Sequence, residues 1–322
     1  MTSNQKYREF CNKEESMPIF VKDWWLDAVC GEKNWDVILI EKDGEIIASM
    51  PYFKKRMIIF DIITMPKLTQ TMGIYIKYPK NQSYVKKLSY EKEVVTEIIS
   101  KLPRFHIFFQ KFNYSLTNWL PFYWAGFKQT TNYTYVIENL SNLDTVFFNF
   151  KKNTKGNIKR AQKTLTVISN DDFRKFYEIN KYTFKKKGVE VPYSLKYADL
   201  IDKACSKRNC RKIFFAVDKN KEYQAAIYVI WDKNSMYYLM GGTNPNNENQ
   251  GANSLLVWEA IKFASTVTNK FDFEGSMIES VEKYFRTFGS IQKPYFKITK
   301  INIKIFYSFK KIIKKIFRKK II

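Results

Sequence analysis

The chain has 322 residues, 45% of them hydrophobic and 17% aromatic, and a formal net charge of +24. This length and apolar content suit two folded domains, and the low proline and glycine content excludes long disordered regions. No run reaches the roughly 18 apolar residues of a membrane-spanning helix, and the N-terminus lacks a secretory signal, so the sequence predicts a cytoplasmic protein.

Hairpins of one design recur in the two halves of the chain. Residues 37–52 have the pattern of strand, Asp-Gly turn and strand, and residues 213–230 repeat it around an Asp-Lys-Asn turn. A helical segment precedes each hairpin, DWWLDAVC in the first half and DFRKFYEINKYTF in the second. The recurrence predicts a duplicated module in an α/β fold with mixed sheets.

The boundary between the two units is predicted after residue 145, between a strand over 132–140 and a basic helix over 153–163. Further along, SMYYLMGGTN predicts a strand and NSLLVWEAIKFAS a buried helix. FDFEG then predicts a strand, SMIESVEKYF a short helix, and KPYFKITKINIKI a terminal strand. The predicted units are residues 1–145 and 146–304, followed by a tail over 305–322.

The tail has the pattern of a basic amphipathic helix. Five apolar residues fall at helical spacing with basic residues on the remaining faces: Phe309, Ile312, Ile313, Ile316 and Phe317. Such helices lie in membrane interfaces, where each basic residue near anionic headgroups contributes about 1 kcal/mol. Either Phe309 to Ile322 holds the protein peripherally at the inner membrane face, or this helix docks on its own protein.

Basic residues also cluster within the second half. The run KKNTKGNIKRAQK over 151–163 has no acid and contains Lys159 and Arg160, and the run FKKKG contains Lys187. A general bias toward lysine, isoleucine and asparagine explains part of the charge, and a solvated face is the usual outcome of such runs. The clustering nevertheless indicates a polyanion or an anionic surface as partner.

Histidine and cysteine usage limits the chemistry. The single histidine, His106, lies in an apolar run that favours a structural role, so zinc sites with several imidazoles are excluded. The spacing of Cys205 and Cys210 fits neither a zinc knuckle nor a redox pair, and we expect reduced thiols and no metal. Proton transfer must then rely on carboxylates, tyrosines, water or substrate groups.

Four stretches together resemble the FemAB-like, or BioF2-like, branch of the GNAT acyltransferase superfamily, which includes the FemABX-type peptidoglycan-bridge aminoacyltransferases. They are MPKLTQTMGIYI, LPFYWAGFKQTTNYTYVI, TFKKKGVEVPYS, and YYLMGGTNPNNENQGANSLLVWEAIKFA running into FDFEGSM. The resemblance covers nearly the whole chain. It implies two tandem GNAT-like modules and transfer of an acyl or aminoacyl group to an amine of a cell-envelope precursor, such as a peptidoglycan or surface-glycan intermediate, without a permanently bound cofactor.

Catalytic residues follow from the resemblance. A strand period places Asp272 and Glu274 on one face, and the resemblance implies that this face lines a cleft. Glu274 is the expected base because it lies nearer the strand end, although an ion pair with a lysine is the alternative. Tyr238 either donates to an oxyanion or packs in the core.

The resemblance also implies substrate contacts. Gln70 and Trp24 belong to shared motifs and suggest an acceptor-binding face between the modules, with core packing as the alternative for Trp24. Arg286 either holds a substrate phosphate or forms a surface salt bridge. Ser276 either contacts substrate or caps the following helix, since Ser276 and Glu279 form an S-x-x-E capping box.

The donor loop departs from the family pattern. Acetyl-CoA-dependent GNATs cradle pyrophosphate in a Q/R-x-x-G-x-G/A loop at a helix N-terminus. In ENQGAN, Glu248 stands where Gln or Arg is expected, and Gln250, Gly251, Ala252 and Asn253 are the expected donor-binding residues. A carboxylate beside pyrophosphate is unfavourable, so aminoacyl-tRNA, whose phosphates Lys159, Arg160 and Lys187 would contact, stays open beside acyl-CoA as co-substrate.

Two other functions stay open. One is an acetyl-CoA-dependent acetyltransferase of an amino sugar. The other is a non-catalytic protein that binds nucleic acid or membranes through its charge.

Overall fold

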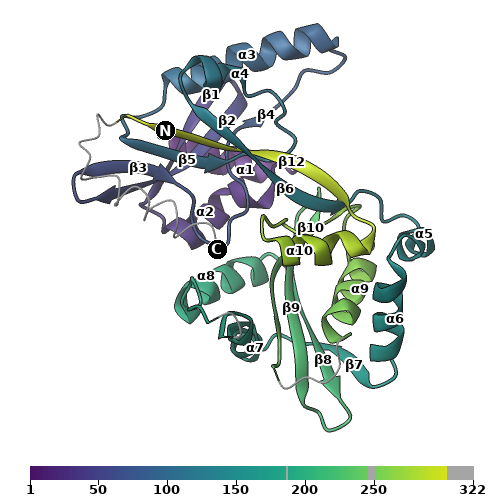
Figure 1. The fold of residues 1–322 in the computed structure, drawn as a ribbon. Coiled ribbons are helices and arrows are strands. Elements are labelled where there is room, and N and C mark those ends of the chain that lie inside the picture. Colours follow the sequence, from purple (N-terminus) through teal and green to yellow (C-terminus); the bar gives the residue numbers. More distant parts are fainter. Residues whose placement is uncertain (186–187, 246–250, 303–322) are drawn as a thin grey trace.

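A computed structural model describes residues 1–185, 188–245 and 251–302 (Figure 1). Within these ranges, twelve strands form one mixed sheet in the order β1-β2-β3-β5-β12-β6-β11-β10-β9-β8-β7, with β4 beside β2. The expected mixed α/β fold is confirmed. The tail with Phe309 to Ile322, and the candidate residues Lys187, Glu248 and Gln250, lie outside the described residues.

The first half contains six strands. They are β1 (Trp35–Lys42), β2 (Glu45–Met57), β3 (Phe60–Thr64), β4 (Tyr75–Ile76), β5 (Ile107–Lys111) and β6 (Lys128–Ile137). The helices of this half are α1 (Ser3–Lys13), η1 (Ile19–Val21), α2 (Asp23–Cys30), α3 (Tyr84–Ser100), α4 (Leu120–Trp124) and α5 (Leu143–Phe148). The predicted Asp-Gly turn joins β1 to β2, and Asp43 and Gly44 both have positive φ, as a type I′ turn requires.

The second half repeats the plan. Its strands are β7 (Leu165–Ser169), β8 (Arg211–Asp218), β9 (Tyr223–Trp231), β10 (Met236–Thr243), β11 (Phe271–Asp272) and β12 (Ile291–Ile301). Its helices are α6 (Lys152–Ala161), α7 (Phe173–Lys185), α8 (Leu195–Ser206), α9 (Ala252–Ala264), α10 (Glu279–Phe285) and η2 (Arg286–Phe288). None of the helices in the described ranges is both long and apolar enough to cross a membrane.

The last strand joins the two halves. β12 lies between β5 and β6 and pairs antiparallel with both, and β6 also pairs with β11. The sheet therefore runs without a break from one half into the other (Figure 1). The predicted boundary after residue 145 assigns β12 to the second unit, although β12 pairs with β5 and β6 of the first. The boundary itself stays a prediction.

Helices cover both faces of the sheet. On one face, α1, α2, α7 and α8 share a single core that spans both halves. On the other face, α3 and α4 cover the first half, while α5, α6, α9 and α10 cover the second half with a core of their own. The shared core fixes the two halves against each other, because burying its apolar side chains is the main favourable term in folding.

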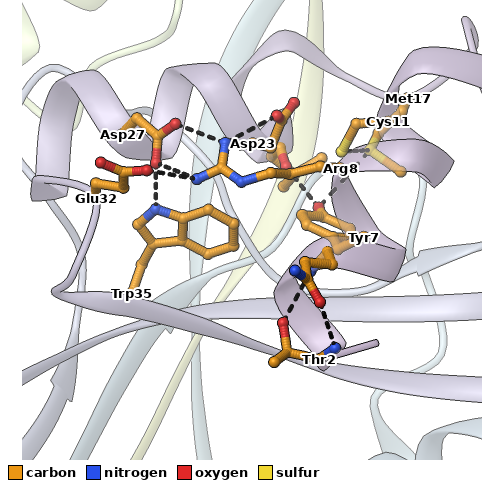
Figure 2. Close-up of polar contacts among 11 residues, drawn as sticks. Thr2, Tyr7, Arg8, Cys11, Met17, Asp23, Asp27, Glu32 and Trp35 are labelled. Carbon is orange, nitrogen blue, oxygen red and sulfur yellow. Dashed lines mark hydrogen bonds and ion pairs between the residues drawn. The ribbon is translucent and has the colours of Figure 1, made fainter.

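An arginine ties α1 to α2 (Figure 2). The Arg8 guanidinium donates to both carboxylate oxygens of Asp27 at 2.7 and 2.9 Å and to Asp23 at 3.2 Å. It also lies over the Trp35 ring, 5.5 Å from the centroid, and the Trp35 indole donates to Asp27. The hydrogen bonds that the Asp27 carboxylate accepts raise the pKa of Arg8, so the network stays charged.

Replacing this arginine should destabilise the fold. Arg8→Leu leaves the nearly buried Asp23 without its cation, and we expect the free energy of unfolding to fall by about 1–3 kcal/mol. The control is Lys6→Leu, because Lys6 pairs with Glu41 at 2.8 Å with both side chains 39% exposed, and surface pairs contribute less than about 1 kcal/mol. Equal urea midpoints for the two variants would contradict the expectation.

Candidate active site

A row of polar side chains crosses one face of the sheet where the two halves meet. Antiparallel register places Lys111 opposite Lys297, Tyr295 opposite Asn132, and Asp272 opposite Val136. Since side chains alternate along a strand, Asn132, Thr134 and Val136 of β6 share this face. Tyr237 of β10 lies opposite Asp272 and joins the row. The same face is otherwise apolar and belongs to the core shared by both halves, so the polar row calls for a functional explanation.

The strands diverge at this row. β11 pairs with β10 only at Met236 and Tyr237, and it ends at Asp272. β10 continues to Thr243, paired with β9 on its other side. Asp272 therefore lies at the point where two parallel strands separate, and such points are where ligands bind to open α/β sheets.

Asp272 is 1% exposed, and one of its carboxylate oxygens accepts two hydrogen bonds. The Thr134 hydroxyl donates to its Oδ1 at 2.5 Å, and the backbone N–H of Glu274 donates to the same oxygen at 2.8 Å. The Gln70 amide donates to the Thr134 hydroxyl at 3.2 Å. Burial raises the pKa of Asp272 to about 6, although the hydrogen bonds from Thr134 and Glu274 oppose the rise.

Glu274 lies beyond the strand, not on it. Its φ is +58°, and Gly275 follows at +64°, so the chain makes a left-handed turn after Asp272. The prediction that both carboxylates occupy one strand face is therefore wrong for Glu274. A non-glycine residue with positive φ is uncommon, and such strain concentrates at functional sites.

The Glu274 carboxylate is poised to accept a proton. Burial and the nearby charge of Asp272 raise its pKa well above the ordinary value. Its Oε1 is buried and has no hydrogen-bond partner within the described ranges, whereas the residue as a whole is half-buried. A carboxylate with one unpaired oxygen and a raised pKa is suited to general base catalysis.

The row also contains two paired lysines, Lys111 and Lys297. Burial and the charge of Lys297 lower the pKa of Lys111, and the charge of Glu274 opposes that shift. Lys111 and Lys297 are both half-buried. The site thus combines a fully buried carboxyl group, a half-buried one, and two half-buried amines.

The buried charge has a measurable stability consequence. Because the folded protein raises the pKa of Asp272 from near 4 to about 6, its stabilising protonated form is fully populated below pH 4 and is lost as pH rises through 6. The ionised form then costs about 3 kcal/mol. Asp272→Asn keeps an oxygen for Thr134 and Glu274, so at pH 8 we expect it to match or exceed the wild type in the free energy of unfolding. The difference should vanish at pH 4, and lower stability of the variant at both values would contradict this.

Tyr238 lies away from the carboxylates. It points to the opposite face of β10, where its hydroxyl donates to Asn253 at 3.4 Å and its ring packs on Phe285. The Asn253 amide donates to the Tyr284 hydroxyl at 3.0 Å. The structure therefore brings Tyr238 and the predicted donor residue Asn253 together, but it places Tyr237 beside Asp272.

The predicted donor loop ends against α6. Gly251 is the N-cap of α9, and a Cβ there would lie 2.3 Å from the backbone oxygen of Asn157. Ala252 begins the helix and is buried. Lys159 and Arg160 are exposed in the last turn of α6, so both basic residues belong to the helix that packs on the donor loop. Their role in binding stays a prediction.

The two predicted acceptor residues differ. Gln70 is nearly buried and joins the carboxylate site by donating to Thr134, and its contact with the acceptor stays a prediction. Trp24 is half-buried on α2, and the Arg208 guanidinium lies 4.5 Å from its ring centroid. Its neighbour Trp25 is the core residue and donates to Thr69.

The two candidates around α10 are held locally. The capping-box interpretation of Ser276 is wrong, because α10 begins at Glu279 with Ile278 as N-cap, and the Ser276 hydroxyl accepts from the Ile278 N–H instead. Arg286 is half exposed and pairs with Glu282 at 3.4 Å. Its surface salt bridge is therefore present, and a phosphate contact stays a prediction.

Six members of the polar row were missed at the sequence level. They are Lys111, Asn132, Thr134, Tyr237, Tyr295 and Lys297. Each lies in an ordinary strand pattern, and only the pairing of β5, β6, β10, β11 and β12 gathers them. His106 accepts a hydrogen bond from the Asp61 N–H at 3.0 Å, in keeping with a structural role. No cluster of three metal-ligating side chains occurs among the residues that the structure describes.

Comparison with known proteins matches this architecture. Residues 149–280 match the family model of the acetyltransferase (GNAT) domain. The crystal structure of FemX superposes with a TM-score of 0.68 at 13% identity and covers 92% of this chain and 96% of its own. L-PGS from Bacillus licheniformis gives a TM-score of 0.56 at 10% identity, covering 99% of this chain and 96% of its own. No curated protein matches the chain in sequence.

A third structure bears on the duplication. A tandem GNAT protein from the clavulanic acid biosynthesis pathway gives a TM-score of 0.53 at 7% identity, covering 94% of this chain and 96% of its own. These findings show a GNAT domain match over residues 149–280 and the fold of a tandem GNAT protein over nearly the whole chain. The fold is that of FemX, which supports the resemblance to the FemAB-like branch seen in the sequence.

Proposed function

We propose that the protein is an N-acyltransferase that transfers an acyl or aminoacyl group to an amino group of a cell-envelope precursor, such as a peptidoglycan or surface-glycan intermediate. The observation that carries the proposal is the Asp272 and Glu274 pair at the divergence of β10 and β11, with raised pKa values and one unpaired oxygen. Amine acylation needs a base for the ammonium proton, and this pair offers one.

In the proposed reaction, Glu274 accepts a proton from the acceptor ammonium. The free amine then forms a bond to the carbonyl carbon of the donor. The bond from that carbon to the leaving sulfur or oxygen breaks, and the second proton of the amine nitrogen passes to the leaving thiolate or alkoxide. Lys111 supplies positive charge on the same face, where the oxyanion of the tetrahedral intermediate develops. Asp272 acts through Glu274, because it holds the Glu274 backbone N–H and raises the pKa of its carboxyl group.

The donor is proposed to be an aminoacyl-tRNA, with acyl-CoA as the alternative. Lys159 and Arg160 are exposed on the helix against which Gly251 packs, which favours a polyanionic donor. Each phosphate contact makes binding steeply dependent on salt. No permanently bound cofactor is invoked.

Mass spectrometry of envelope precursors tests the function. Cells with and without the protein should differ by one precursor whose added mass identifies the transferred group. If no amine of the envelope gains mass, and the purified protein binds tRNA or DNA with a steep salt dependence but acylates no amine with either donor, a non-catalytic binding protein replaces the proposal. Added mass of a single acetyl group on an amino sugar would favour acetyl-CoA instead.

A further inference from the structure

The turn between β2 and β3 exposes two adjacent isoleucines. Ile58 and Ile59 are 72% and 61% exposed, and they form the loop between Met57 and its partner Phe60. Single exposed apolar residues are ordinary on protein surfaces. An adjacent pair at the tip of a hairpin is a small apolar patch that a binding surface would explain.

The backbone at this tip is also strained. The φ of Ile58 is +58°, in the left-handed region where a β-branched residue is an outlier. Ile58 is the first residue of a two-residue hairpin loop, a position where positive φ favours glycine. Keeping an exposed isoleucine there disfavours the folded state and calls for a functional explanation.

Basic residues adjoin the apolar tip. Lys54, Lys55 and Arg56 precede it on β2, and all three are exposed. An apolar tip flanked by lysine and arginine matches the interface of an anionic bilayer, because the isoleucines can enter the acyl boundary while the cations meet the headgroups.

The C-terminal end of the described chain lies beside this hairpin. Ile301, at the end of β12, pairs with Ile107 of β5, which pairs with Ile62 of β3. The backbone N–H of Asn302 donates to the carbonyl of His106 at 2.8 Å. β3, β5 and β12 lie side by side in Figure 1, so the described chain ends at the same end of these strands as the hairpin turn.

Charge indicates which partner covers the two isoleucines at the tip of the hairpin. Residues 303–322 contain eight lysine and arginine residues and no acidic residue. A segment of that charge is repelled by Lys54, Lys55 and Arg56, which disfavours the chain's own C-terminal segment as the cover of the isoleucines. An anionic surface attracts both basic segments at once.

We propose that the β2–β3 turn is a membrane-docking site that inserts Ile58 and Ile59 into an anionic lipid bilayer, with residues 54–56 at the headgroups. This inference does not depend on the proposed acyl transfer, and vesicle binding tests it without any substrate.

The test compares binding of the full chain to phosphatidylcholine vesicles with and without phosphatidylglycerol. The variant Ile58→Gly with Ile59→Ser suits the turn geometry and should keep or raise thermal stability. We expect it to bind anionic vesicles at least about tenfold more weakly than the wild type, since two apolar side chains are lost. Unchanged binding would overturn the proposal.

A matched control comes from α3. Tyr84 and Val85 are 75% and 71% exposed and are followed by Lys86 and Lys87, so Tyr84→Ser with Val85→Ser removes a similar apolar pair beside similar charge. This variant should bind vesicles as the wild type does. An equal loss in both variants would show that any exposed apolar pair suffices and would contradict a specific docking site.

A site-specific fluorescent label distinguishes a bilayer from the other partners that could cover the two isoleucines. All four native cysteines are buried, so a polarity-sensitive dye can be attached selectively to Ile59→Cys and, as control, to Val85→Cys. With anionic vesicles, the emission at position 59 should shift to the blue and that at position 85 should not. A blue shift without vesicles would overturn the proposal: it would indicate a second copy if it grows with protein concentration, and the C-terminal segment if it does not.

Discussion

Glu274→Gln should lower the rate of acyl transfer by about 10²- to 10⁴-fold, because it removes the group proposed to accept the ammonium proton. The rate is measured as the appearance of the added mass on the envelope precursor. Glutamine has nearly the same size, so Asp272, Thr134 and the left-handed turn should keep their places. In the wild type the rate should rise with pH as the Glu274 carboxyl group ionises, and the variant should lose this dependence.

Asp272→Asn separates the base from the residue that positions it. The charge of Asp272 raises the pKa of Glu274, so its removal should move the rising limb of the pH profile to lower pH. The loss in rate should be smaller than for Glu274→Gln, since asparagine can still accept from the Glu274 N–H. If Asp272→Asn abolishes the limb while Glu274→Gln retains it, the two roles are exchanged.

Local signals in the sequence predicted the elements around the site well. The segment DWWLDAVC forms α2, and the Asp-Gly turn joins β1 to β2, because hydrophobic periodicity and turn preferences act within a few residues. The strand at FDFEG ends early, at Asp272. A left-handed glutamate has no sequence signature, because its strain is sustained by contacts made elsewhere in the fold.

Which residues line the site is decided by the pairing of strands that lie far apart in the sequence. Tyr237 and Tyr238 are adjacent in sequence, and only the pairing of β10 with β11 decides which of them faces Asp272. A one-residue difference in register reverses the face, so the choice of Tyr238 could not be checked locally. Lys111 and Lys297 meet because β12 enters the sheet between β5 and β6, a pairing across nearly two hundred residues. Non-local pairings of this kind leave no periodic trace in the chain.

Gly275→Ala should destabilise the protein by about 2–4 kcal/mol. The φ of Gly275 is +64°, which costs an alanine roughly 1–2 kcal/mol. A Cβ there would also lie 2.1 Å from the Tyr133 carbonyl oxygen and 2.6 Å from the Thr134 Cα. Both are backbone atoms of β6, so the clash is relieved only by moving β11 away from its partner strand, and Glu274 would move with it.

Gly44→Ala isolates the contribution of that clash. Gly44 has a φ of +79° in the β1–β2 turn, and nothing lies within 4 Å of a Cβ built there. In this control, alanine bears only the cost of the left-handed conformation, about 1–2 kcal/mol. Urea unfolding should show a larger loss for Gly275→Ala, together with loss of transferase activity that Gly44→Ala retains. Equal urea midpoints for the two variants would mean that β6 can shift at Tyr133 to make room for the Cβ. The rigid turn would then not be what fixes Glu274 beside Asp272.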